Sequence, residues 1–117
     1  DAKLQPVDLA AVVHEALSLL EHRFEEEGVT LRLALPPGLP QVMAEPVRLE
    51  QVVVNLVANA LDAVAERSER VVTVMAEASG EGASLIVGDT GAGIAWGWQT
   101  VLLLFPETKA HARQQRR

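Results

Sequence analysis

The chain has 117 residues, of which 49% are hydrophobic and 22% charged, and this length and composition suit one folded domain. It contains no cysteine, which excludes disulfide frameworks, thiolate zinc sites and cysteine nucleophiles. The net charge of −6 divides into −10 over residues 1–108 and +4 over residues 109–117. An acidic body of this kind argues against a nucleic-acid partner.

Metal clusters and membrane segments are also disfavoured. The three histidines are too dispersed to form a metal site (His14, His22 and His111). The apolar run Val101 to Phe105, which no other apolar run exceeds, is far shorter than the roughly 20 residues that span a bilayer. Residues 1–8 lack the basic start and apolar stretch of a signal peptide. We therefore expect no membrane contact by this domain.

The first predicted element is a helix that begins after Asp8 and ends at Gly28. Asp8 is a suitable N-cap, because its carboxylate can accept hydrogen bonds from free backbone N–H groups. Gly28 can take the left-handed conformation that ends many helices. Apolar residues recur between them at helical spacing (Leu9, Val12, Val13, Ala16, Leu17, Leu20 and Phe24).

Strands and a second helix follow. Residues 29–35 alternate apolar and polar side chains with period two and predict a half-buried strand. Residues 41–44 predict a short edge strand. A second helix is expected from Glu45 or Pro46 to Glu66, with the proline in the first turn, where its missing N–H costs nothing.

The last predicted elements are two strands, 70–78 and 83–89. They flank a glycine-containing turn, and this order predicts an antiparallel hairpin. The order helix, strand, short strand, helix, hairpin does not alternate as a doubly wound sheet does. It predicts an α+β fold: a two-layer α/β sandwich with helices packed on one face of a mixed sheet.

A polar stripe runs along the second predicted helix. Asn55, Asn59 and Asp62 stand at i, i+4 and i+7, and Gln51 lies one turn earlier. Asn and Asp each cost about 0.6 kcal/mol relative to Ala in a helix, so their presence needs a reason. Two interpretations stay open: a solvated face, or a surface that holds a hydrated divalent cation such as Mg²⁺ through amide and carboxylate oxygens.

A glycine-containing loop follows the last predicted strand, with the sequence Asp-Thr-Gly-Ala-Gly-Ile at 89–94. Gly91 and Gly93 permit positive φ and close approach of the backbone to a ligand. Asp89 could accept a hydrogen bond from an exocyclic amine such as that of adenine. The glycine spacing fits neither a Walker loop nor a Rossmann loop, so hydride transfer is not expected.

Taken together, residues 50–63 and 89–94 resemble the N box and the G1 box of the catalytic ATP-binding domain of bacterial sensor histidine kinases, which has a GHKL or Bergerat-type fold. The likeness is greatest to the C4-dicarboxylate and nitrogen-regulation sensors. Residues 4–9 resemble the join between the dimerisation helices and this domain. The resemblance implies ATP and Mg²⁺ as cofactors and a mobile lid over the nucleotide.

The resemblance also implies a role for each matching residue. Asn59 would ligate Mg²⁺ through its amide oxygen, and Asn55 would face the phosphates. Asp62 would lie nearer the nucleoside end, and Asp89 would read the adenine amino group. Residues 91 and 93, both glycine, would let the loop pass close to the nucleotide.

The residue at position 55 helps to distinguish ATP hydrolysis from phosphoryl transfer to a protein. In related ATPases a glutamate four residues before the Mg²⁺-binding asparagine activates water, whereas Asn55 cannot act as a base. This favours transfer of the γ-phosphoryl group to a histidine on a separate dimerisation and phosphoacceptor domain of the same parent protein, with a response regulator as an indirect partner. The implied location is cytoplasmic, and membrane anchoring of the parent stays open. Alone, the chain is not expected to autophosphorylate.

The resemblance ends after Ile94. We therefore assign residues 1–94 to the ATP-binding core and residues 95–117 to an atypical lid region and basic tail. Because no second glycine box is matched after Ile94, we expect the fold to be truncated at its C-terminus. This favours an alternative, a degenerate, non-catalytic remnant that serves as a protein-interaction module. A third reading is a structural domain whose asparagine stripe is fortuitous.

The apolar run that begins at Val101 is expected to pack on the bare sheet face or to pair between two chains, giving a homodimer through residues 96–105. We expect the side chains of Trp96 and Trp98 to pack in the core or at an interface instead of stacking on a base.

Overall fold

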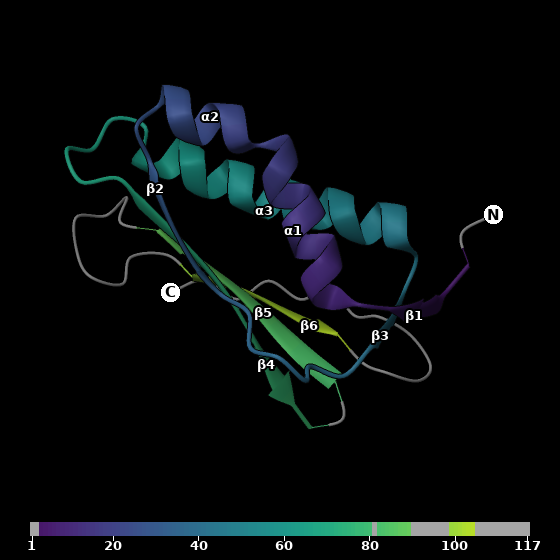
Figure 1. Ribbon diagram of the computed structural model, residues 1–117. Coiled ribbons are helices and arrows are strands. Elements are labelled where there is room, and N and C mark those ends of the chain that lie inside the picture. Colours follow the sequence, from purple (N-terminus) through teal and green to yellow (C-terminus); the bar gives the residue numbers. More distant parts are fainter. Residues whose placement is uncertain (1–2, 81, 90–98, 105–117) are drawn as a thin grey trace.

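The computed structural model describes residues 3–80, 82–89 and 99–104. Figure 1 shows the helices gathered on one face of a twisted sheet, which confirms the predicted α+β sandwich. The elements in chain order are β1 (Gln5–Val7), α1 (Leu9–Leu19), α2 (Glu21–Glu26), β2 (Thr30–Ala34), β3 (Val42–Ala44), α3 (Pro46–Val64), β4 (Val71–Ser79), β5 (Gly82–Asp89) and β6 (Gln99–Leu104).

The main sheet has the strand order β2-β4-β5-β6. Strand β2 runs parallel to β4, and the β4–β5 and β5–β6 pairs are antiparallel, so the sheet is mixed as predicted. The β4–β5 pair is the predicted hairpin, and Gly80 at its turn has φ +61°, a conformation that glycine adopts without strain. The hairpin joins the two strands that lie nearest to α3.

Helix α3 supplies one wall of the core. Its apolar residues are buried along one side (Leu49, Val53, Leu56, Val57, Ala60, Leu61 and Val64). They pack with the sheet residues Val72, Val74, Leu85 and Val87, and α1 lies alongside α3 in the same layer (Figure 1). The helix begins as predicted, because the Glu45 carboxylate accepts hydrogen bonds from the first free backbone N–H groups, at 2.9 and 3.3 Å.

The prediction of one continuous first helix is wrong, because the structure has two helices, α1 and α2, in this segment. Asp8 caps α1 by accepting from the backbone N–H of Ala11 at 3.3 Å, and α1 ends at Leu19. Leu20 then leaves helical geometry with φ −107° and ψ 4°, and α2 begins at Glu21. Both Leu20 and Phe24 stay buried, so the apolar spacing continues through the break and gave no sign of it. The predicted end is confirmed, since Gly28 has φ +65°.

The N-terminal residues 5–7 form a strand that the sequence did not predict. Strand β1 pairs antiparallel with β3 in a separate two-stranded sheet, with Gln5 opposite Ala44. The predicted edge strand at 41–44 therefore exists, but its partner is β1. Strand β2 is more exposed than predicted: Leu31 is partly buried, whereas Leu33 is 40% exposed, because β2 lies at the edge of the main sheet.

The apolar run after residue 100 extends the sheet at its edge instead of packing on its face. Strand β6 pairs with β5 from Ala83 opposite Leu104 to Gly88 opposite Gln99. Phe105 lies outside the described residues, and pairing between two chains stays a prediction. Among the helices of the described segments, none is long and apolar enough to cross a membrane.

The packing of α3 gives a stability prediction. We expect Leu61→Ala, at a fully buried position, to lower the free energy of unfolding by about 2–5 kcal/mol, because it removes buried methyl groups and leaves a cavity. The matched control is Leu19→Ala at a helix position that is 64% exposed, where we expect a change within about 0.5 kcal/mol. Urea unfolding measures both, and equal losses would show that α3 does not pack as described.

Candidate functional site

The solvent face of α3 carries the predicted polar stripe. Asn55, Asn59 and Asp62 are all exposed, and Gln51 continues the exposed face by one turn. The opposite side of the helix is buried against the sheet and α1, so the backbone that carries these side chains is fixed by the core. The structure thus brings the three α3 residues of the predicted site onto one rigid, accessible surface.

Asp89 lies at the end of β5 and is 8% exposed. It is paired across the hairpin with Val72, and directly paired residues of antiparallel strands share a face, so Asp89 is on the side of the sheet that the helices cover. Only residues 65–70 connect α3 to β4. Val72 and Asp89 therefore lie at the end of the fold where α3 finishes, together with Asn59 and Asp62.

Two predicted site residues, Gly91 and Gly93, lie outside the described residues. The same holds for Trp96, Trp98 and the basic tail from residue 109. The predicted roles of the glycine-containing loop therefore stay predictions.

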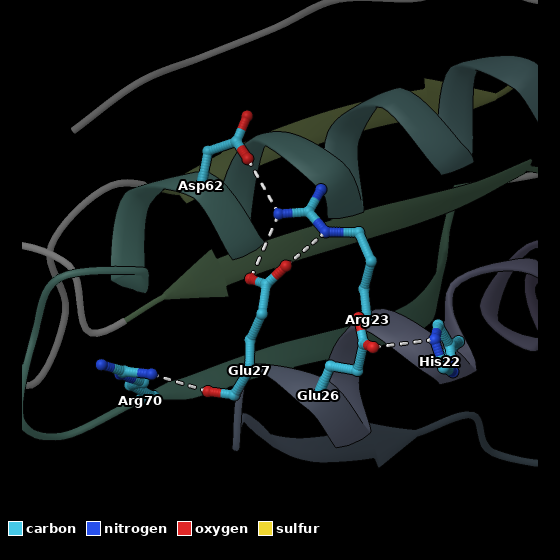
Figure 2. Close-up of polar contacts among 6 residues, drawn as sticks. All are labelled: His22, Arg23, Glu26, Glu27, Asp62 and Arg70. Atoms are coloured by element: carbon cyan, nitrogen blue, oxygen red, sulfur yellow. Dashed lines mark hydrogen bonds and ion pairs between the residues drawn. The ribbon is translucent and has the colours of Figure 1, made fainter.

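Arg23 is a residue of this region that the sequence did not single out. Its guanidinium Nη2 donates to Asp62 Oδ1 at 3.0 Å, and it also forms a two-pronged pair with the Glu27 carboxylate at 2.7 and 3.2 Å (Figure 2). The pair with Glu27 follows the i, i+4 spacing within α2 and could be read from the sequence. The pair with Asp62 joins positions 39 residues apart, and no local pattern signals it.

Further contacts fix the position of α2 beside α3. The Arg70 guanidinium donates to the backbone carbonyl of Glu27 at 2.7 Å, as Figure 2 also shows, and to the carbonyl of Arg67 at 2.7 Å. The hydrogen bonds from Arg23 hold the pKa of Glu27 below its usual value, and hydrogen bonds to the two carboxylates raise the pKa of Arg23. The Arg23–Asp62 ion pair thus links α2 to α3, and the hydrogen bond from Arg70 to the Glu27 carbonyl links the end of α2 to the connection that leads into β4.

Glu50, on the buried flank of the N-terminal half of α3, has a different environment. It is half-buried, and its Oε2 atom is shielded from solvent and finds no hydrogen-bond partner in the described part of the chain. Burial, and next the negative charge of Glu15 on α1, raise the pKa of Glu50. The α1–α3 contact therefore contains a carboxylate whose charged form is disfavoured.

Two further kinds of site are relevant in the described segments: metal-binding clusters and hollows. No group of three or more histidine, cysteine, aspartate and glutamate side chains gathers in these segments in a way that could hold a metal ion. An open hollow of about 380 Å³ lies over the ends of β2 and β4, lined by Leu35, Met75 and Ile86 among others. It lies away from the exposed face of α3 and is lined mainly by apolar side chains, so it does not coincide with the predicted site.

Comparison with known proteins gives consistent results. Residues 44–100 match the family described as histidine kinase-, DNA gyrase B-, and HSP90-like ATPase. The chain is 40% identical over 90 residues to the C4-dicarboxylate transport sensor protein DctB of Rhizobium meliloti, covering 77% of this chain and 14% of that protein. It is 37% identical over 92 residues to the sensor histidine kinase ZraS of Escherichia coli K12, covering 79% of this chain and 19% of that protein.

Solved structures agree with the sequence relatives. Full-length ShkA in complex with AMPPNP superposes with a TM-score of 0.66 at 28% identity, covering 78% of this chain and 19% of that one. The catalytic domain of histidine kinase ThkA superposes with a TM-score of 0.68 at 21% identity, covering 76% of this chain and 60% of that one, and shows the shared fold.

The chain belongs to the histidine kinase-, DNA gyrase B-, and HSP90-like ATPase family, with sensor histidine kinases as its relatives. The predicted resemblance, including the likeness to C4-dicarboxylate sensors, is confirmed. The chain spans 14% and 19% of the length of the two curated relatives described above.

The environment of Glu50 predicts a pH-dependent stability. A folded-state pKa above the ordinary value of 4.5 means that the folded chain binds more protons than the unfolded chain between the two values, so wild-type stability falls as pH rises through this window. We expect Glu50→Gln to raise the free energy of unfolding at pH 7 and to have little effect near pH 4.

The control for this experiment is Glu25→Gln, at an exposed position of α2. Urea unfolding at several pH values measures the difference from wild type. A stabilisation by Glu50→Gln that is the same at both pH values would contradict a disfavoured charge at this position.

Proposed function

We propose that this chain is the ATP-binding catalytic domain of a two-component sensor histidine kinase. It binds ATP with Mg²⁺ and donates the γ-phosphoryl group to a histidine on a separate dimerisation and phosphoacceptor domain of the same parent protein. A response regulator then receives the phosphoryl group from that histidine. The observation that carries the proposal is the exposed pair Asn55 and Asn59 on a helix that the core holds rigid, in a chain of this family.

The donor set suits Mg²⁺. Mg²⁺ prefers hard oxygen ligands and keeps several water molecules, so it is commonly held by one or two protein oxygens together with phosphate oxygens. Asn59 presents an accessible amide oxygen on the exposed face of α3, and Asn55 lies one turn away. In the proposal Asn59 is the protein ligand, and the metal neutralises charge on the phosphates.

The rest of the site is assigned by the same reasoning. Asn55 faces the phosphates, and as an amide it cannot take a proton from water, which favours transfer to a positioned histidine over hydrolysis. Asp89, held at the end of β5 on the helix-covered side, reads the adenine amino group. One solved relative, ShkA, was crystallised with the ATP analogue AMPPNP, which supports nucleotide binding by this domain type.

The competing function is a non-catalytic remnant of the same fold that acts as an interaction module. The loss of the motif resemblance after Ile94 favours it. The two functions differ in whether the chain binds nucleotide, so binding is the decisive measurement.

We expect calorimetric titration of the full chain with ATP to show binding that requires Mg²⁺. Asn59→Ala and Asp89→Ala each remove a hydrogen-bonding or ligating group and should weaken binding at least about tenfold. Gln41→Ala, which removes an exposed amide in the loop before β3, is the control and should leave the affinity unchanged. In Asn59→Ala the affinity should also lose most of its dependence on Mg²⁺.

Absence of binding at millimolar ATP by a folded chain would reject the proposal in favour of the remnant. Where binding is found, mixing the chain with the phosphoacceptor domain and γ-labelled ATP tests transfer. The expected product is an acid-labile phosphohistidine on that domain.

A further inference from the structure

The Arg23–Asp62 ion pair connects α2 to the face of α3 that carries Asn55 and Asn59. Asp62 belongs to this face, one turn beyond Asn59, and its side chain is 70% exposed. Arg23 reaches it from α2 with a side chain that is 34% exposed, and its guanidinium is also paired with Glu27 (Figure 2). Arg23 is thus fixed on α2 by one carboxylate while it contacts a second carboxylate at the proposed site.

The charge on this face matters because the proposed ligand is a polyanion. Residues 1–108 carry a net charge of −10 and only six basic side chains. An uncompensated carboxylate at position 62 would lie within about one Debye length of phosphates held at Asn59, and its repulsion would be only partly screened. Arg23 places a positive charge against Asp62, and the two hydrogen bonds that it donates to the Glu27 carboxylate keep the guanidinium in place.

We propose that Arg23 is a positioning residue of the nucleotide site: its ion pair cancels the charge of Asp62 and holds that side chain, so that the Asn55–Asn59 face can accept the phosphates of Mg–ATP. This inference rests on the proposed function. It adds a residue of α2, outside the two sequence motifs, to the determinants of affinity, and it acts through Asp62 rather than by touching the nucleotide.

The experiment measures the affinity of the full chain for Mg–ATP at low and high ionic strength. Arg23→Gln should weaken binding roughly three- to tenfold at low salt, as expected for one uncompensated charge within a Debye length of the phosphates, and less at high salt. Arg23→Lys should keep most of the affinity. Arg32→Gln, which makes the same change in net charge on the exposed edge strand β2, is the control and should have little effect.

Removing the charge of one carboxylate partner in the Arg23→Gln background tests whether Arg23 acts through Asp62. Asp62→Asn in the Arg23→Gln background should return the affinity to within about twofold of wild type, because the uncompensated charge is gone. Glu27→Gln in the same background removes the other carboxylate partner, which lies on α2 and not on the Asn55–Asn59 face, and should restore less. Far-UV circular dichroism and melting temperature verify that each variant is folded.

The outcomes separate the two proposals. If wild type does not bind Mg–ATP, the proposed function fails and this inference falls with it. If wild type binds and a folded Arg23→Gln binds equally well at low salt, the proposed function stands and the role of Arg23 is wrong. The same conclusion follows if Asp62→Asn fails to restore binding, or if Glu27→Gln restores it to the same extent.

Discussion

The burial of one side of α3 is the constraint on which the rest of the structure depends. A 19-residue helix in water is not stable by propensity alone, and this one includes asparagine and aspartate residues that weaken it further. Seven buried apolar residues packed on β4, β5 and α1 offset that cost. Packing on one side therefore allows the other side to carry asparagine and aspartate, which are poor helix formers.

The same constraint determines where the polar groups meet. Because α3 lies over the hairpin and a short connection returns the chain to β4, the last turns of α3 and the end of β5 share one end of the fold. Asp89 is brought there by strand pairing and Asn59 by helix packing, although they are 30 residues apart in the sequence. A site of this kind needs no loop of its own on the helix side, because the sandwich supplies a rigid surface.

Much of this arrangement could be predicted from the sequence, since it rests on short-range patterns. The caps at Asp8 and Gly28, the apolar period of α3 and the turn at Gly80 each follow from local chemistry, and the structure confirms them. The break at Leu20 could not be predicted, because a buried side chain on either side of it preserves the helical spacing. Strand β1 was missed because three residues with a central proline carry no strand pattern, and only pairing with β3 makes them a strand.

The candidate site shows the same division. Asn55, Asn59 and Asp62 could be selected by spacing within one helix, whereas Arg23 became visible only when α2 and α3 were seen side by side. In an acidic chain proposed to bind a polyanion, the position of each cation matters, and one of the six in residues 1–108 is paired with a carboxylate on the proposed binding face. The charge balance of a nucleotide site is thus a property of the folded surface, and a sequence motif describes only the part of it that lies on one element.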